Sequence, residues 1–334
     1  MYKCTFFICL LLFATFTPIQ AADDDKKIVV SSASMIWDMV NNIAGDKVES
    51  QLIVPIGSDP HLYDPSPTDA QKVSKADLIF MNGLTFEGWI NQLIESSGTK
   101  APTITVTNGL TPISSSEYQD AFDPHAWMDV NKAQTYIKNI YEGLVRILPE
   151  EKATFESNYK AYSKKLKELD EYITQQINRV PEEHRILITS HDAFSYYGQR
   201  YGLRIEGVMG TSTEAEAQTS DLRRVMSIIN TSGVPAIFVE STVNPKLMNQ
   251  IASDNKVKIG GSLYADSIGK KGSDGDSYYN MMKSNTDVIT KALLGSGVAQ
   301  LNAPSEGSGN FLMYGIIGAI MLISLLFLIF RMNK

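Results

Sequence analysis

The chain has 334 residues, of which 20% are charged and 43% are hydrophobic, and its formal net charge at pH 7 is −7. This acidic balance, without a P-loop or a cluster of Arg and Lys, disfavours nucleic acid and anionic lipid as partners. The only two cysteines, Cys4 and Cys9, lie near the N-terminus. A metal site elsewhere in the chain must therefore use nitrogen and oxygen ligands.

Residues 1–21 are typical of a secretory signal peptide. Lys3 is their only charged residue, residues 6–16 are predominantly apolar, and Ala21 and Ala22 offer a cleavage point. A signal anchor that stays in place is the alternative, because no small residue stands three positions before that point. Neither cysteine follows the small-residue pattern of a lipid-modification site. We therefore expect an exported protein without an N-terminal lipid anchor.

A second apolar segment, residues 311–330, contains twenty residues without a charge and is followed by Arg331 and Lys334. Twenty helical residues match a hydrocarbon core of ~30 Å, so the segment predicts a transmembrane helix. The positive charges behind it predict a cytoplasmic tail at 331–334, with the preceding chain outside. The Gly, Ser and Pro content of residues 297–310 predicts a flexible linker to this helix.

Strand-like and helix-like runs alternate in two blocks between these end segments. This alternation predicts one βα lobe over residues 27–148 and a second over residues 182–296, each with a largely parallel sheet. Residues 149–181 contain no glycine and no internal proline, and their apolar periodicity predicts an amphipathic helix of about thirty residues. Such a helix spans ~45 Å, longer than one lobe needs, so we expect it to link the lobes. The predicted fold class is α/β.

Three of the four histidines stand in patterns that suit a metal ligand. His61 and His125 each end an Asp-Pro-His motif, in which the proline stiffens the chain. His191 follows an apolar strand of the second lobe, and Asp266 follows its last strand, at the carboxyl ends where open sheets bind ligands. His184 lies in a charged connector before its strand, and we expect it at the surface.

Each of these residues also has an ordinary structural explanation. His61 could be an exposed loop residue, His125 could cap or pack beside Trp127, and Asp266 could cap a turn. Together, however, three histidines and one aspartate, two from each lobe, form a nitrogen and oxygen set suited to Zn²⁺, Mn²⁺ or Fe²⁺.

Other polar and aromatic candidates are weaker. Glu240 ends a strand, where it could orient a ligand histidine or simply face solvent. Residues 269–276 lack the full spacing of a calcium loop, so Asp276 is predicted to cap the last helix. The tyrosine pairs at 196–197 and 278–279 are interpreted as helix packing.

Several stretches carry a resemblance to a known family, among them "PIGSDPHLYDPSPTDAQKVSKADLIFMNGLTFEGW", "DPHAWMDV", "LITSHDAFSYYGQRYGL", "TSTEAEAQTSDL" and "DSIGKKGSDGDSYYNMM". Over about residues 27–296 the chain resembles the metal-binding solute-binding proteins of ABC transporters known as cluster A-I (cluster 9, TroA-like). The resemblance implies two βα lobes joined by one long helix, with one divalent transition metal in the interlobe cleft. The implied ligands are His61, His125, His191 and Asp266.

The resemblance also limits which metals the site is expected to bind. Many manganese-type members carry glutamate where this chain has His191, and zinc-type members often carry a histidine-rich loop that this chain lacks. The His₃Asp set resembles that of members binding both zinc and manganese, and Fe²⁺ is a further candidate.

The implied function is capture of the ion outside the cytoplasm by a membrane-anchored monomer, which delivers it to an ABC permease and its ATPase. No catalysis is expected, because four protein ligands fill a tetrahedral zinc site. The first alternative is a zinc-dependent hydrolase, although no HExxH motif is present. The others are an adhesin-type surface protein on the same fold and a receptor for a metal chelate.

Overall fold

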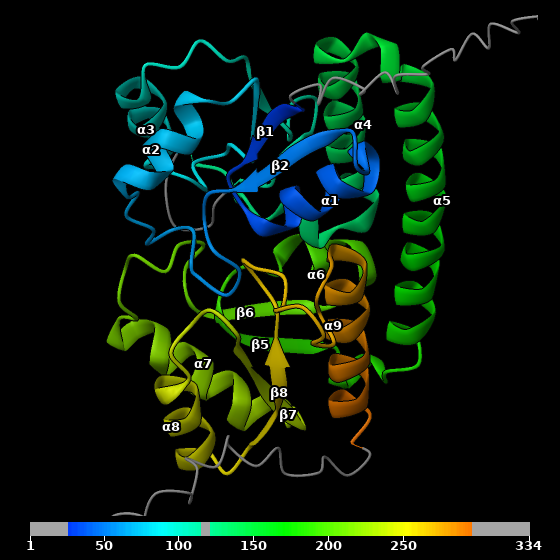
Figure 1. The fold of residues 1–334 in the computed structure, drawn as a ribbon. Helices are drawn as coiled ribbons and strands as arrows, with labels where there is room; N and C mark the ends of the chain where they lie inside the picture. The colour runs from blue at the N-terminus through cyan, green and yellow to red at the C-terminus, as the bar shows by residue number, and fades with distance from the viewer. Residues whose placement is uncertain (1–25, 115–120, 296–334) are drawn as a thin grey trace, which may run out of the picture.

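The computed structural model describes residues 26–114 and 121–295 (Figure 1). The signal peptide predicted at 1–21 and the linker, transmembrane helix and tail predicted at 297–334 lie outside these residues. Within the described ranges, none of the helices combines the length and apolar character needed to cross a membrane.

The first lobe is a four-stranded parallel sheet with helices packed around it. The strands lie in the order β2-β1-β3-β4, and every neighbouring pair is parallel. They are β1 (Lys27–Ser31), β2 (Val48–Leu52), β3 (Leu78–Met81) and β4 (Thr103–Thr105). The helices are α1 (Ser34–Ala44), α2 (Pro67–Ser74), α3 (Ile90–Ser97) and α4 (Val130–Ile147), with a 3₁₀ turn, η1 (Ala126–Met128), before α4.

The second lobe also pairs its strands in parallel, in two separate two-stranded sheets. The strands are β5 (Ile186–His191), β6 (Arg204–Met209), β7 (Ala236–Glu240) and β8 (Lys258–Leu263), paired as β5-β6 and β7-β8. The helices are α6 (Ser195–Tyr201), α7 (Thr219–Ser232), α8 (Lys246–Asp254) and α9 (Tyr278–Leu293). The predicted α/β class with parallel sheets is confirmed.

A long helix, α5 (Lys152–Ile177), runs along both lobes at the right of Figure 1. It contacts α1 and α4 of the first lobe and α6 and α9 of the second. With 26 residues it is shorter than the predicted 149–181. Pro149 begins a separate 3₁₀ turn, η2 (Pro149–Glu151), and the residues after Ile177 form turns before another, η3 (Glu182–His184).

The lobes meet through one continuous apolar core and several buried hydrogen bonds. The largest cluster of buried apolar residues includes members of both lobes and of α5. Trp127 Nε1 donates to the carbonyl of Ala265 at 3.1 Å, and the Tyr278 hydroxyl donates to the carbonyl of Trp127 at 2.6 Å. The Tyr196 hydroxyl donates to the carbonyl of Asp123 at 2.8 Å. The tyrosine pairs therefore pack as predicted, and one member of each pair also ties the lobes together.

Asp276 does not cap the last helix, contrary to the sequence prediction. Ser277 is the N-cap of α9, because its extended backbone places Oγ where it accepts from the amide of Asn280. The Asp276 carboxylate instead accepts from the amide of Gly272 and the side chain of Asn280, which closes the preceding loop.

Replacing Tyr278 by Phe tests the contribution of these lobe contacts. The change removes the hydroxyl from the buried Trp127 carbonyl, and a lost buried hydrogen bond costs about 1–3 kcal/mol. Urea unfolding should therefore show a free energy of unfolding lower by that amount. Tyr279→Phe at the partly exposed neighbouring position is the control, and equal losses in both variants would contradict the prediction.

Candidate metal centre

His61 lies in the loop after β2 and is held there through its backbone. The Oδ1 atom of Asp59 accepts a hydrogen bond from the His61 amide at 2.9 Å. The imidazole ring stands edge-on to Phe86, with the ring centroids 4.9 Å apart. His61 is only 7% exposed, so the alternative of an exposed loop histidine is wrong.

The second Asp-Pro-His motif positions His125 through both its backbone and its ring. Asp123 Oδ1 accepts from the His125 amide at 2.9 Å and lies 2.7 Å from the ring Nδ1. A proton held on Nδ1 by this carboxylate leaves Nε2 as the free donor atom. The side chain of Asn82 supports the loop by donating to the carbonyl of Pro124 at 3.0 Å.

A buried carboxylate, that of Glu87, supports the loop of His125 indirectly, through Asn82. Glu87 accepts hydrogen bonds from the amides of Asn82 and Gly83, at 2.7 Å and 3.1 Å, and from the hydroxyl of Ser32. These contacts fix the backbone of Asn82, whose side chain holds the loop of His125. Sequence reasoning did not identify Asp123 or Glu87 as supporting residues. For Asp123 the available signal was its place two residues before a candidate ligand.

His191 is the last residue of β5, and Glu240 is the last residue of β7. The Oε1 atom of Glu240 accepts from the His191 amide at 2.9 Å, and Oε2 lies 2.5 Å from the ring Nδ1. Glu240 is 2% exposed. It therefore orients the histidine instead of facing solvent. Gly207 on the neighbouring strand allows this tight packing, because a Cβ there would lie 2.6 Å from the amide nitrogen of Asp192.

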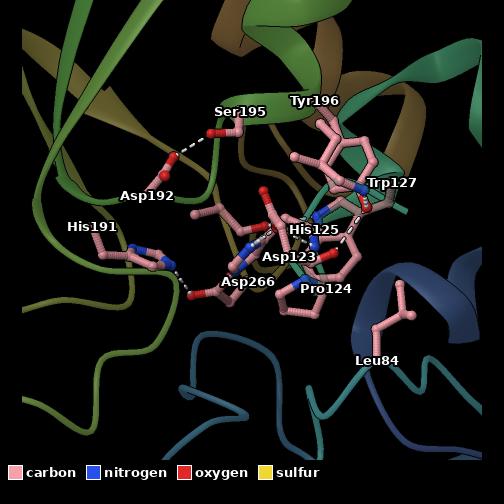
Figure 2. A network of polar contacts seen from close by, with 12 residues as sticks. Leu84, Asp123, Pro124, His125, Trp127, His191, Asp192, Ser195, Tyr196 and Asp266 are labelled. Atoms are coloured by element: carbon pink, nitrogen blue, oxygen red, sulfur yellow. Dashed lines mark hydrogen bonds and ion pairs between the residues drawn. The ribbon is translucent and has the colours of Figure 1, made fainter. Parts of the chain in front are cut away.

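Asp266 follows β8 and lies between the histidine rings from the two lobes (Figure 2). Its Oδ1 lies 3.3 Å from His125 Nε2, and its Oδ2 lies 3.3 Å from His191 Nε2. The Nε2 atoms of His61 and His125 are 3.4 Å apart. Both Asp266 oxygens are buried, and neither has a hydrogen-bond partner within the described ranges. The structure thus brings all four candidate residues together, with one potential ligand atom from each within 4.8 Å of the others.

His184 does not join this group. It ends the 3₁₀ turn η3, is half-buried, and its Nδ1 lies 3.1 Å from the carbonyl of Leu293. The prediction that it is not a ligand candidate agrees with this position, although its side chain is less exposed than expected.

The pKa of His61 is shifted in the opposite direction from the pKa values of His125 and His191. Burial, which outweighs the opposing effect of Asp266, lowers the pKa of His61 to about 3, and the nearby His125 and His191 rings contribute to this lowering. Burial alone would also lower the pKa of His125, but the Asp123 and Asp266 carboxylates outweigh it and raise this pKa to about 9. For His191 the same burial effect is outweighed by Glu240 and Asp266, which raise its pKa well above the ordinary value.

Asp266 carries the negative charge that the protonated rings of His125 and His191 face. Burial would raise its pKa, but the His191 and His125 rings hold it well below the usual range. In the absence of a cation, protons on these two histidines neutralise the buried carboxylate. A divalent cation at the same position would supply that positive charge instead, because metal ligands must be deprotonated.

Comparison with known proteins assigns the chain to a family. Residues 29–292 match the family described as "Zinc-uptake complex component A periplasmic". The "Manganese-binding lipoprotein MntA" of Halalkalibacterium halodurans is 36% identical over 272 residues, covering 81% of this chain and 90% of the relative. The "Manganese ABC transporter substrate-binding lipoprotein scaA" of Streptococcus gordonii is 36% identical over 310 residues, covering 88% and 99%.

Solved structures agree with the sequence comparison. The periplasmic zinc binding protein TroA from Treponema pallidum superposes with a TM-score of 0.77 at 33% identity, covering 80% of this chain and 99% of that one. A Mn-bound periplasmic metal binding protein from Candidatus Liberibacter asiaticus gives a TM-score of 0.74 at 30% identity, covering 80% and 100%. The chain therefore belongs to the family of periplasmic zinc-uptake components, the metal-binding solute-binding proteins of ABC transporters.

Proposed function

We propose that this protein captures one divalent transition-metal ion with His61, His125, His191 and Asp266 and passes it to an ABC permease driven by an ATPase. The ion is cargo and is released unchanged. Membership of a family of metal-transport components supports this function and supports neither the hydrolase nor the adhesin alternative.

The observation that carries the proposal is the spacing of the four ligand atoms. A tetrahedral ion with bonds of about 2.1 Å places its ligand atoms about 3.4 Å apart. Three close pairs have this separation: Asp266 Oδ1 with His125 Nε2 (3.3 Å), Asp266 Oδ2 with His191 Nε2 (3.3 Å), and His61 Nε2 with His125 Nε2 (3.4 Å). One ligand atom from each of the four residues lies within 4.8 Å of the others. Asp266 is buried, and its charge must be compensated by protons on His125 and His191 or, once these rings are deprotonated, by a cation.

The donor set supports zinc and manganese as the cargo. Three imidazoles and a carboxylate suit Zn²⁺, Mn²⁺ and Fe²⁺ alike. Asp266 turns one oxygen toward His125 and the other toward His191, so binding through both would give five donor atoms. The additional oxygen favours a harder ion such as Mn²⁺. The relatives named for manganese and the solved structure named for zinc both fit this set.

We further propose how the described residues are carried outside the cell. Residues 1–21 direct export, residues 27–148 and 182–296 form the two lobes, and 149–181 link them. Residues 311–330 then anchor the protein in the cytoplasmic membrane. The relatives above are named lipoproteins, whereas this chain has an uncharged segment of twenty residues near its C-terminus. That segment supports an anchor of a different kind.

Single replacements of the ligands should weaken metal binding strongly. His61→Ala, His125→Ala, His191→Ala and Asp266→Ala each remove about a quarter of the coordination sphere, and we expect affinity losses of at least about 100-fold. Calorimetric titration with Zn²⁺ and Mn²⁺ measures this, and wild type should bind one ion per chain. His184→Ala is the matched control and should bind as wild type does. Wild-type affinity in a His191→Ala or Asp266→Ala variant would refute the assignment.

Metal affinity should rise continuously from pH 6 to pH 9. The pKa values of His125, about 9, and of His191, well above the ordinary value, keep both rings protonated at neutral pH in the metal-free protein. An entering ion must displace these protons, so acid weakens binding and alkali strengthens it. The pKa of His61, about 3, means that this ligand releases no proton.

Titrations in buffers of different ionisation enthalpy should therefore detect about two protons released per ion near pH 7. Ligands of ordinary pKa, near 6.5, would instead give an affinity that is constant above about pH 7.5. A constant affinity between pH 7.5 and pH 9 would contradict the prediction.

Proteolysis of intact cells or spheroplasts tests the anchor. If residues 311–330 span the membrane, protease added from outside should cut within 297–310 and release a soluble, metal-binding fragment. A variant that ends at residue 310 should be secreted without protease. Complete protection of the chain from external protease would show that the orientation is wrong.

A further inference from the structure

The two Asp-Pro-His motifs use their aspartates in different ways. In the second motif, Asp123 contacts both the amide and the ring Nδ1 of His125 through Oδ1. In the first motif, Asp59 contacts the amide of His61 through Oδ1, and its Oδ2 accepts a hydrogen bond from the Thr213 hydroxyl at 2.6 Å. Thr213 belongs to the opposite lobe, in the segment between β6 and α7.

This contact joins the lobes on the side where the ion site is nearest to solvent. His61 is 7% exposed, whereas the other three ligands are 0% exposed. The hydrogen bonds of Trp127 and Tyr278 join the lobes next to His125 and Asp266, within the buried core. The contact of Asp59 with Thr213 and that of the Gly57 amide with Ser267 Oγ, at 2.7 Å, hold the loop of His61 against the second lobe.

The ligands differ in how firmly their rings are held. The rings of His125 and His191 each have a buried carboxylate at Nδ1. The ring of His61 packs edge-on against Phe86, and the carboxylate of its own motif is engaged with the other lobe. The position of His61 among the four ligands therefore depends on its loop staying in contact with the second lobe.

We propose that Asp59 is a positioning residue that, through Thr213, keeps His61 over the bound ion and sets how long the ion stays. The proposal rests on the proposed function of the site. When the Asp59–Thr213 hydrogen bond breaks, the loop of residues 56–61 moves away from the second lobe while the rest of the first lobe stays in place, and His61 is the first ligand to leave. The other three ligands stay together, because Asp123 and Glu240 hold the rings of His125 and His191, and Asp266 lies buried against both rings.

The test measures ion dissociation from the full-length protein carrying conservative changes at Thr213. Zn²⁺-loaded protein is mixed with excess EDTA in a stopped-flow instrument, and association is measured separately with free Zn²⁺. Thr213→Val has almost the same shape without the hydroxyl, so dissociation should be about tenfold faster while association stays unchanged. Thr213→Ser keeps the hydroxyl and should restore the wild-type dissociation rate.

Thr231→Val is the matched control, because the Thr231 hydroxyl donates to the carbonyls of Ser227 and Ile228 within α7 of the same lobe. It should dissociate at the wild-type rate. Circular dichroism of each variant shows whether it is folded, and Thr213→Ala, which also lacks the hydroxyl, provides the test if Thr213→Val does not fold. A rate for Thr213→Ser that differs from wild type, or a wild-type rate for folded Thr213→Val, would overturn the proposal.

The outcomes also separate this proposal from the proposed function. If wild type binds no ion, both are wrong. If wild type binds one ion and Thr213→Val releases it at the wild-type rate, only the role of Asp59 is wrong. Equal changes in association and dissociation would indicate a general structural effect and would also refute it.

Discussion

The structure depends on one electrostatic constraint, the burial of a carboxylate between two histidines that come from different lobes. Asp266 is 0% exposed, and isolated charge is costly in such surroundings. Its negative charge is acceptable only because His125 and His191 each face one of its oxygens at 3.3 Å. Each of these rings is in turn held at Nδ1 by a further buried carboxylate, Asp123 or Glu240. The alternating chain of carboxylates and imidazoles fixes the donor atoms before any ion arrives.

This arrangement explains why the fold needs two lobes and a shared core. The carboxyl ends of β5 and β7 bring His191 and Glu240 together, while η1 and the loop before it carry His125 from the other lobe. The long helix α5 contacts helices of both lobes, and one apolar cluster runs through them. Together they keep the buried part of the site at a fixed separation. The loop of His61 is joined to the second lobe by the polar contacts of Asp59 and Gly57, and we propose that release occurs on that side.

The hydrogen bonds of the two aspartates explain why the two Asp-Pro-His motifs hold their histidines differently. Both Asp-Pro-His motifs place an aspartate oxygen on the amide of their own histidine. The motif at 123–125 is surrounded by buried residues, so its carboxylate can also hold the ring. The motif at 59–61 lies nearer to solvent and beside the other lobe, so its second oxygen is available to Thr213. The same Asp-Pro-His motif thus gives one rigidly held ligand, His125, and one ligand, His61, whose position we propose depends on contact between the lobes.

Much of this could be predicted from the sequence, because the signals are local. Apolar periodicity predicted the alternating strands and helices, an amphipathic helix over residues 149–181, and the parallel sheets. The stiff Asp-Pro-His motifs and the strand-end positions of His191 and Asp266 identified the candidate ligands. Boundaries that depend on a single turn were less accurate, as shown by the 3₁₀ turn at Pro149 and by Ser277, which caps α9 in place of Asp276.

What only the tertiary structure decided is the set of contacts between residues far apart in the chain. Glu240 is 49 residues from His191, Thr213 is 154 residues from Asp59, and Trp127 is 138 residues from Ala265. No periodicity or motif specifies such pairs, because they follow from how the two lobes pack. The sequence by itself determined the chemistry of the ligands and the architecture that carries them. The packing of the lobes determined which carboxylates are buried beside which rings, and with them the pKa values and the rigidity of the site.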